Sequence, residues 1–152
     1  MMVFEHDYEN YPELTNTQLQ ELQFTSPHQQ ITEDFEAVVV KVHDGDTVTL
    51  RAEFRDFDFP LRLLDIDAPE LNEGGEATRE WLKTQILNQK VQVLIDPMNR
   101  VGKYGRLLGR ILHRGLDIGQ AELRMGLAVP FGTKNEGKFL PLSQLFSLRQ
   151  WF

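Results

Sequence analysis

Carboxylates and arginines end or interrupt short apolar segments in this chain, in a pattern that could do phosphate chemistry. The acids that follow two such segments are Asp44, Asp46, Asp67 and Glu70. Arg62 lies inside the second segment, and the string Lys-Tyr-Gly-Arg places another arginine before a later one. Hard divalent cations prefer carboxylate oxygens, and a planar guanidinium grips a phosphate through two parallel hydrogen bonds. These residue types predict a metal-assisted phosphate site at strand ends.

The individual motifs have two readings each. Asp44-Gly45 is a strong hairpin turn signal and needs no function. Asp46, however, adds a second carboxylate at the start of a strand, where Thr or Val would suit the strand better. A cation site would explain that placement. The Lys-Tyr-Gly-Arg string is equally compatible with a solvated turn.

Arg62 is the hardest of these residues to explain by structure alone. Alternation from Leu64 and Ile66 places it on a largely apolar face, where a guanidinium is costly unless it is paired. Either a structural ion pair or a phosphate clamp would compensate its charge. Asp67 follows Arg62 by an odd number of residues, so a regular strand would send the two side chains to opposite faces. A turn or bulge is needed to bring them together.

The elements that must position these residues form an α+β domain. The expected strands are Ala37–Val42, Thr47–Arg51, Phe57–Ile66, Val91–Ile95 and Leu107–Leu112. The expected helices are Glu76–Leu87, Leu116–Met125 and Pro141–Phe152. This order favours a five-stranded OB-fold β-barrel with about three helices.

The charge distribution divides the chain at residues 34/35. Residues 1–36 contain eight acids and no Lys or Arg, whereas residues 79–152 carry a net charge of +7. We expect residues 1–34 to form an acidic N-terminal arm outside the core, with one short helix capped by Thr15 or Asn16. Residues 35–152 would form the domain. The arm is either a solvated extension or a segment that docks a protein partner or the domain's own basic groove, where it could inhibit.

Composition excludes several classes. With 41% hydrophobic and 26% charged residues, the chain is typical of a globular domain. No apolar run is long enough for a membrane span, so no membrane partner is expected. The chain has no cysteine, and its four histidines lack ligand-like spacing, so a zinc site is not expected. The first residues lack a basic segment followed by an apolar one, so we expect a cytoplasmic protein.

Together and in order, four segments resemble the staphylococcal nuclease (thermonuclease) family. They are DGDT at 44–47, RLLDIDAPE at 62–70, KYGR at 103–106 and GLA at 126–128, and the resemblance extends from about residue 35 to residue 131. It implies an OB barrel and Ca²⁺-dependent cleavage of phosphodiester bonds in DNA and RNA, with 3′-phosphate products.

The resemblance also implies a metal-binding set. Asp46 and Asp67 match the family's metal-ligating carboxylates. Ala68 stands where the family usually has Thr, and it would contribute its backbone carbonyl, for which Ala should serve. The implied cofactor is Ca²⁺, with another divalent cation as the alternative.

The remaining functional positions match residue by residue. Arg62 and Arg106 match the two guanidinium groups around the scissile phosphate, and Glu70 matches the general base or water-orienting group. Lys103 and Tyr104 match residues that help to hold the nucleotide.

A catalytically silent module that binds nucleic acid or protein is the alternative function. Members of this fold that serve as scaffolds usually lose the arginines or carboxylates, and this chain retains them. The chain does lack the tyrosines expected just after GLA, where Phe131 is the nearest aromatic residue.

Overall fold

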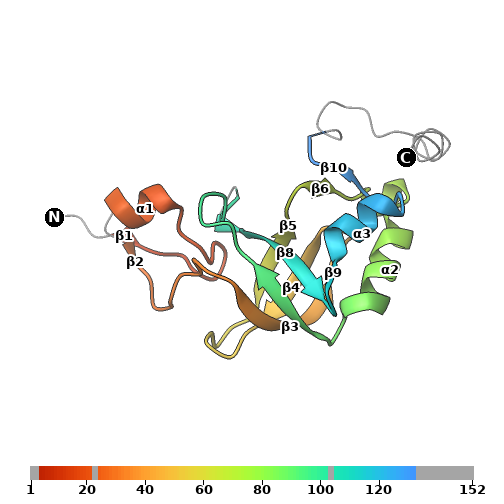
Figure 1. Cartoon of the computed structure of the whole chain (residues 1–152). Helices are drawn as coiled ribbons and strands as arrows, with labels where there is room; N and C mark the ends of the chain where they lie inside the picture. The colour runs from red at the N-terminus through yellow and green to blue at the C-terminus, as the bar shows by residue number, and fades with distance from the viewer. Residues whose placement is uncertain (1–3, 22–23, 103–104, 133–152) are drawn as a thin grey trace.

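A closed β-barrel forms the centre of the molecule. The computed structural model describes residues 4–21, 24–102 and 105–132 (Figure 1). The barrel strands follow the order β5-β4-β3-β7-β8, and β5 pairs with β8 to close the sheet. Their bounds are Phe35–Val42 for β3, Thr47–Arg51 for β4, Phe59–Leu63 for β5, Lys90–Leu94 for β7 and Leu107–His113 for β8. The closing β5–β8 pair is parallel and the other barrel pairs are antiparallel. The expected five-stranded barrel is confirmed.

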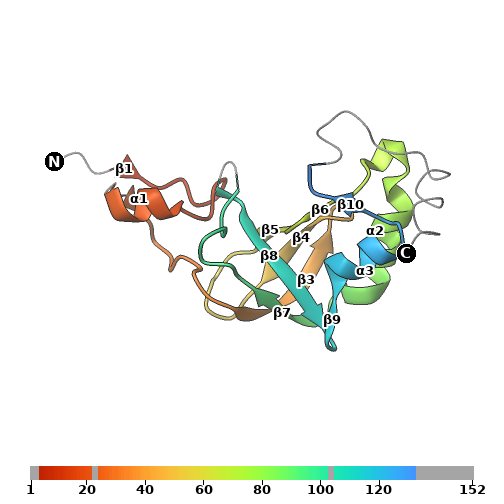
Figure 2. The same ribbon diagram turned by 45° about the horizontal axis from the view of Figure 1, so that its top comes forward.

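Alternating apolar side chains fill the barrel. Val48, Leu61 and Ile111 are fully buried, and the intervening residues of their strands are more exposed. Two helices pack at one end of the barrel: α2 (Gly75–Ile86) and α3 (Ile118–Arg124). Figures 1 and 2 both show these helices at the end of the barrel opposite the N-terminal segment. The spacing of apolar residues thus determines which face of each strand points into the barrel and which faces of α2 and α3 pack against its end.

The expected strand over residues 57–66 is split in two. It breaks after β5, because Asp65 adopts a left-handed conformation with φ 67°. The chain then resumes as β6 (Ile66–Asp67), which leaves the barrel sheet and pairs with β10 (Val129–Pro130). The other short elements are β1 (Phe4–Glu5), α1 (Asn16–Glu21), β2 (Phe24–Thr25), η1 (Leu71–Glu73) and β9 (Leu116–Asp117).

The short helix expected in the N-terminal arm is present as α1. Its cap is Thr15, whose Oγ1 accepts a hydrogen bond from Gln18 N at 3.1 Å while Gln18 Oε1 accepts one from Thr15 N at 2.8 Å. This reciprocal pair satisfies two backbone donors that a helix start otherwise leaves open. The helix expected over Pro141–Phe152 lies outside the described residues. Within the described part, every helix is too short or too polar to traverse a lipid bilayer.

The expectation that residues 1–34 lie outside the core is wrong for Leu14 and Ile31. Glu13 and Leu14 are buried, and Ile31 belongs to the hydrophobic core. The polar composition of the arm predicted solvation, but these side chains find buried partners on the barrel. The division into an arm and a domain at residues 34/35 stays a prediction.

Candidate active site

Six of the predicted site residues line one cleft of about 280 Å³. They are Asp46, Arg62, Asp67, Ala68, Glu70 and Arg106, and Asp44 and Thr47 complete the lining. The cleft lies where β4 starts and where β5, β6 and the loop before β8 meet. Side chains from four separate segments therefore converge at one place. Lys103 and Tyr104 lie outside the described residues, so their role stays a prediction.

Strand register brings Asp46 beside the second acidic segment. Thr47 pairs with Arg62 across β4 and β5, and Leu63 N donates to Asp46 O at 2.8 Å. The Asp46 carboxylate also accepts a hydrogen bond from Ala68 N, with 2.8 Å between Oδ2 and N. Asp46 is thus held to the segment of Asp67 through both its backbone and its side chain.

Gly45 is required for this close approach. A Cβ atom at this position would lie 2.3 Å from Thr78 Cγ2 and 2.7 Å from Ala68 Cβ. Such contacts are too short for any side chain, so only glycine lets the Asp44–Asp46 turn pack between α2 and β6. The turn itself is closed by Asp46 N, which donates to Asp44 Oδ1 at 3.0 Å. The Asp-Gly-Asp string therefore acts both as a turn and as a positioning device.

Arg62 lies between the carboxylates of Asp46 and Asp67 in the cleft. Its Nη2 is 2.6 Å from Asp67 Oδ1 and 3.4 Å from Asp46 Oδ2. Its Nη1 donates to the carbonyls of Leu63 and Ile66 at 2.6 and 2.8 Å. A planar group with this many acceptors has little freedom to turn.

The turn at Asp65 brings Arg62 and Asp67 together, although their odd separation in sequence would place them on opposite faces of a regular strand. It re-aims Asp67 so that its carboxylate meets Arg62. The expected face of Arg62 was wrong, because the buried side of β5 carries Phe59, Leu61 and Leu63, and Arg62 lies on the other side. The ion pair expected as one of two explanations is present, and a phosphate role would use the same guanidinium.

Glu70 and Arg106 are exposed residues on the rim of the cleft. The backbone carbonyl of Glu70 accepts from Gly75 N at 2.9 Å, and a Cβ on Gly75 would lie 2.2 Å from the carbonyl oxygen of Pro69. The start of α2 is thus packed directly against the Glu70 segment. The carbonyl of Arg106 accepts from Gly102 N at 2.8 Å, which closes the loop before β8.

Two acids, Asp44 in the cleft and Glu122 in α3, have a raised pKa. Burial, followed by the neighbouring Asp46, raises the pKa of Asp44 to about 6. Glu122 of α3 is fully buried, and burial together with the charges of Asp46 and Asp44 raises its pKa to about 9. Neither carboxyl oxygen of Glu122 has a hydrogen-bond partner among the described residues. Glu122 is therefore protonated at neutral pH, next to a site that already holds several negative charges.

The acidic residues fit a hard cation that is completed by other ligands. Among the described residues, no group of three or more acids or histidines is close enough to hold a metal alone. Asp46 and Asp67 nevertheless both line the cleft and both approach Arg62. Hard cations such as Mg²⁺ are commonly held by one or two carboxylates, with water and substrate phosphate supplying the rest. The arrangement matches that type of site and not a preformed cage.

Sequence reasoning assigned no role to Thr47 of the cleft lining or to Glu122 of α3. Asp44 also lines the cleft; it was among the acids of the predicted phosphate site, and its Asp-Gly dipeptide was interpreted as a turn as well. Glu122 carried a readable signal, since it falls on the inward stripe of α3 with Ile118 and Ala121.

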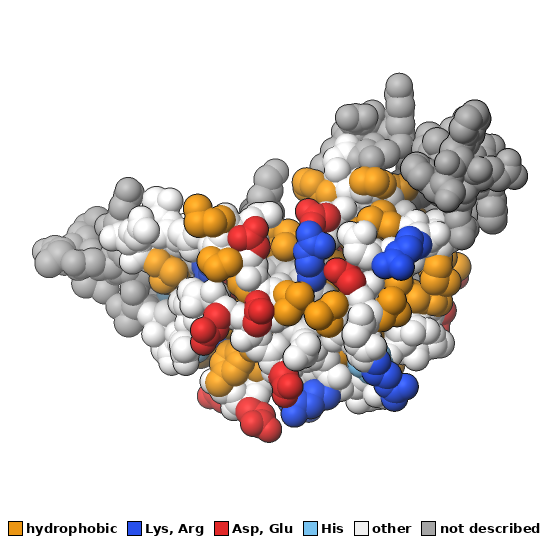
Figure 3. Space-filling view, in the orientation of Figure 1, with side chains coloured by type: hydrophobic (Ala, Val, Ile, Leu, Met, Phe, Trp, Pro, Cys, Tyr) orange, Lys and Arg blue, Asp and Glu red, His pale blue; other side chains and the backbone are white. Residues whose placement is uncertain are grey.

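Figure 3 shows acidic and basic side chains intermixed over one face of the molecule, without a continuous basic surface there.

The relatives that match this chain in sequence include proteins named as nucleases. The "Probable endonuclease LCL3" of Ajellomyces dermatitidis is 31% identical over 115 residues, which cover 61% of this chain and 37% of that protein. The "Micrococcal nuclease" of Shigella flexneri is 38% identical over 77 residues, which cover 50% of this chain and 41% of that protein. The chain thus spans about two fifths of the length of these relatives. The profile of the family described as "Staphylococcal nuclease homologue" matches residues 60–145, more than half of the chain, and the chain belongs to that family.

Proposed function

We propose that this protein is a metal-dependent nuclease that hydrolyses phosphodiester bonds of DNA, RNA or both. The observation that carries the proposal is the convergence of two carboxylates, a rim carboxylate and two arginines on one cleft. These residues are Asp46, Asp67, Glu70, Arg62 and Arg106. They come from separate segments of the chain, and a purely structural role would not require all five in one place.

The proposed cofactor is Ca²⁺ or another hard divalent cation. Asp46 and Asp67 would hold it, with the backbone carbonyl of Ala68 as a third ligand. Bound there, the cation would orient a phosphodiester and stabilise the charge that develops on its oxygens. The carboxylates supply this site with negative charge that Arg62 alone offsets only in part.

The protein's own groups would carry out the remaining steps. Arg62 and Arg106 would donate hydrogen bonds to phosphate oxygens as negative charge builds on them. Glu70 would accept the proton of the attacking water. The new bond forms between the water oxygen and phosphorus, the bond from phosphorus to the 5′-oxygen breaks, and that oxygen takes up a proton from solvent water; Glu70 returns its own proton to the solvent. The products would be a 3′-phosphate and a 5′-hydroxyl.

The names of the relatives support this proposal. One is called a probable endonuclease and another a micrococcal nuclease, and each is aligned over only part of its length. We extend nuclease activity, and internal cleavage, to this chain on that basis together with the cleft. The cytoplasmic location expected from the sequence is likewise a prediction, which fractionation of cells expressing the tagged protein would test.

The test is cleavage of single-stranded DNA by the purified protein. We expect products with Ca²⁺, none with an excess of chelator, and a loss on the order of 10²–10³ in rate for Glu70→Gln and for Arg62→Ala. Arg51→Ala is the matched control, because Arg51 forms an exposed pair with Asp58 away from the cleft. Tight DNA binding with no products would refute the enzyme and favour a silent binding module.

A further inference from the structure

Glu13 of the N-terminal arm is buried between Arg55, in the connection from β4 to β5, and Arg100, in the connection from β7 to β8. Its Oε1 lies 2.6 Å from Arg55 Nη2, and its Oε2 lies 2.8 Å from Arg100 Nη2. All three side chains are at most 2% exposed. Ile31 N, later in the arm, donates to the same carboxylate at 3.0 Å. Removing one partner from such a buried ion pair would leave an uncompensated charge inside the protein, so the arm is fixed at this point.

Arg100 connects the arm to the loop that carries Arg106. Its guanidinium donates to the carbonyls of Leu14 and Ile31 at 2.5 and 2.7 Å, so it binds the arm at two further points. Its own carbonyl accepts from Leu108 N at 2.9 Å, which closes the base of the loop. Burial lowers the pKa of Arg100, and Glu13 opposes that effect. The residue that anchors the arm is therefore also the first residue of the loop.

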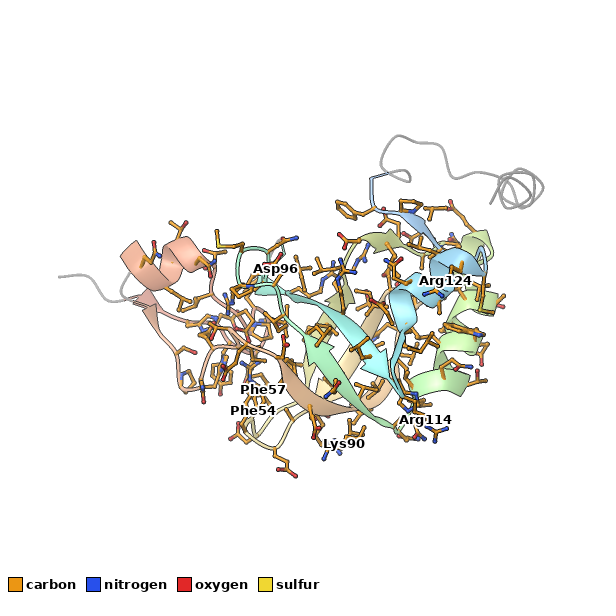
Figure 4. The ribbon with its side chains drawn as sticks, in the orientation of Figure 1. Phe54, Phe57, Lys90, Asp96, Arg114 and Arg124 are labelled. Carbon is orange, nitrogen blue, oxygen red and sulfur yellow. The ribbon has the colours of Figure 1, made fainter. Side chains whose placement is uncertain are left out.

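A second contact joins the arm to the residue next to Arg106. Glu13 N donates to Gly105 O at 3.0 Å. Gly105 has φ 73°, and a Cβ there would lie 2.6 Å from Glu13 O and 3.0 Å from Tyr11 Cβ. The arm backbone thus lies against Gly105 with no room for a side chain. Figure 4 labels Asp96, where the chain leaving β7 approaches the arm, and Asn16 Nδ2 donates to Pro97 O there at 2.9 Å.

We propose that Glu13 is a positioning residue that fixes residues 100–102 and 105–108, the described part of the loop that leads into β8, and thereby holds Arg106 at the cleft. The inference rests on the proposed function for the role of Arg106. The arm would then be part of the working enzyme and not an inhibitor of it. In agreement, no acidic side chain of the described part of the arm pairs with Arg62 or Arg106. The acid that docks the arm meets Arg55 and Arg100, which lie outside the cleft lining.

The test is a double-mutant cycle between Glu13→Gln and Arg106→Ala, read as the kcat and KM for DNA cleavage. Small displacements of a positioned group can cost about 10²-fold in rate. We expect Glu13→Gln to lower kcat roughly 10- to 100-fold with a smaller change in KM. In the Arg106→Ala background the same change should cost less than about 2-fold, because the group it positions is gone. Equal losses in both backgrounds would overturn the proposal.

Ile86→Ala is the control for general loss of stability. Ile86 is a fully buried residue of α2, and Figure 1 shows this helix at the end of the barrel away from the arm. Ile86→Ala should change kcat by the same factor in the natural protein and in the Arg106→Ala background. Glu13→Asp is the variant to use if Glu13→Gln does not fold, because it keeps the charge between the arginines. It should give a smaller loss of kcat that also disappears with Arg106→Ala.

Amide hydrogen exchange tests the positioning role without any activity. Leu108 N–H and Gly102 N–H are bonded within the loop. We expect their exchange to become at least about 10-fold faster in Glu13→Gln than in Ile86→Ala at matched global stability. Faster exchange in an inactive protein would uphold the positioning and refute only the nuclease. Unchanged exchange would overturn the positioning role itself.

Discussion

Glu122 should make the stability of this protein fall as pH rises. Its side chain is fully buried in α3, its two oxygens lack hydrogen-bond partners among the described residues, and its pKa is raised to about 9. The unfolded chain loses this proton near pH 4.5, whereas the folded protein keeps it to about pH 9. The favourable contribution is therefore complete below pH 4.5 and is lost progressively between 4.5 and 9.

The size of the effect follows from the pKa difference. Each pH unit in this window costs about 1.4 kcal/mol of unfolding free energy, so the accumulated cost at pH 7 is about 3 kcal/mol. That is a large share of the roughly 5–15 kcal/mol that stabilises a typical domain. Glu122→Leu removes the titrating group and places an apolar side chain among the buried Ile118 and Ala121. We expect it to raise the unfolding free energy at pH 7 by about 3 kcal/mol or more.

The assay is urea denaturation of both proteins between pH 5 and 8.5. The difference in unfolding free energy between Glu122→Leu and the natural protein should grow by about 1.4 kcal/mol per pH unit, since the other titrating groups are common to both. Glu122→Gln cannot titrate and should show the same slope with a smaller offset, because it still buries a polar group. A difference that stays constant with pH would refute the argument, since Glu122 would then be ionised in the folded state.

Two further predictions concern the cleft. Arg62→Met should bind Ca²⁺ about 10-fold more tightly in calorimetric titration without nucleic acid, because the guanidinium that faces both carboxylates is gone. The same variant should lose cleavage. Weaker Ca²⁺ binding would mean that Arg62 organises those carboxylates. Phe131→Ala should raise the KM for single-stranded DNA roughly 5- to 100-fold, because this ring is 64% exposed, the next residue Gly132 donates through its N–H to Asp67 Oδ2 at 3.3 Å, and an exposed ring near the cleft can stack on a base. Phe54→Ala is its matched control, since Phe54 is also exposed and Figure 4 places it on the loop between β4 and β5; equal effects of the two changes would contradict stacking at Phe131.

Local pattern predicted most of the strands, and the resemblance to the staphylococcal nuclease family predicted the closed barrel and most of the cleft residues. The Asp-Gly turn signal around Gly45 predicts where β3 ends and where β4 begins. The pairing of Thr47 with Arg62 then follows from antiparallel register, and it brings Asp46 to the second acidic segment. Residues at strand ends are positioned by the same period that builds the core, so the sequence carries that information.

The split of the expected strand over residues 57–66 was harder to foresee. Its apolar residues continue through Leu64 and Ile66, and periodicity alone does not stop there. Asp65 ends β5 by adopting a left-handed conformation, and its carboxylate pairs with Arg110 of β8. Asp is one of the few residues other than glycine that tolerates this conformation, so a signal existed but was weak. The whole Arg62–Asp67 geometry depends on that turn.

The docking of the arm could not be read from sequence. Glu13 meets arginines that lie 42 and 87 positions further along the chain. No local pattern links residues at such distances, and an acidic, proline-containing segment is typical of solvated chain. Only the three-dimensional packing around Arg55 and Arg100 shows that one acid of this segment is buried.

The two buried acids show why charge composition is a poor guide to function in this chain. Glu13 has two guanidinium groups within hydrogen-bonding distance, so its burial fixes a segment, whereas Glu122 has none and is buried as a neutral acid. The first adds a strong constraint near Arg106, and the second avoids adding another negative charge near Asp46. Both acids count equally toward the net charge of −7, yet neither contributes free negative charge that would repel a nucleic acid. An acidic protein can therefore present a site suited to a polyanion, because part of its formal charge is paired or protonated inside the fold.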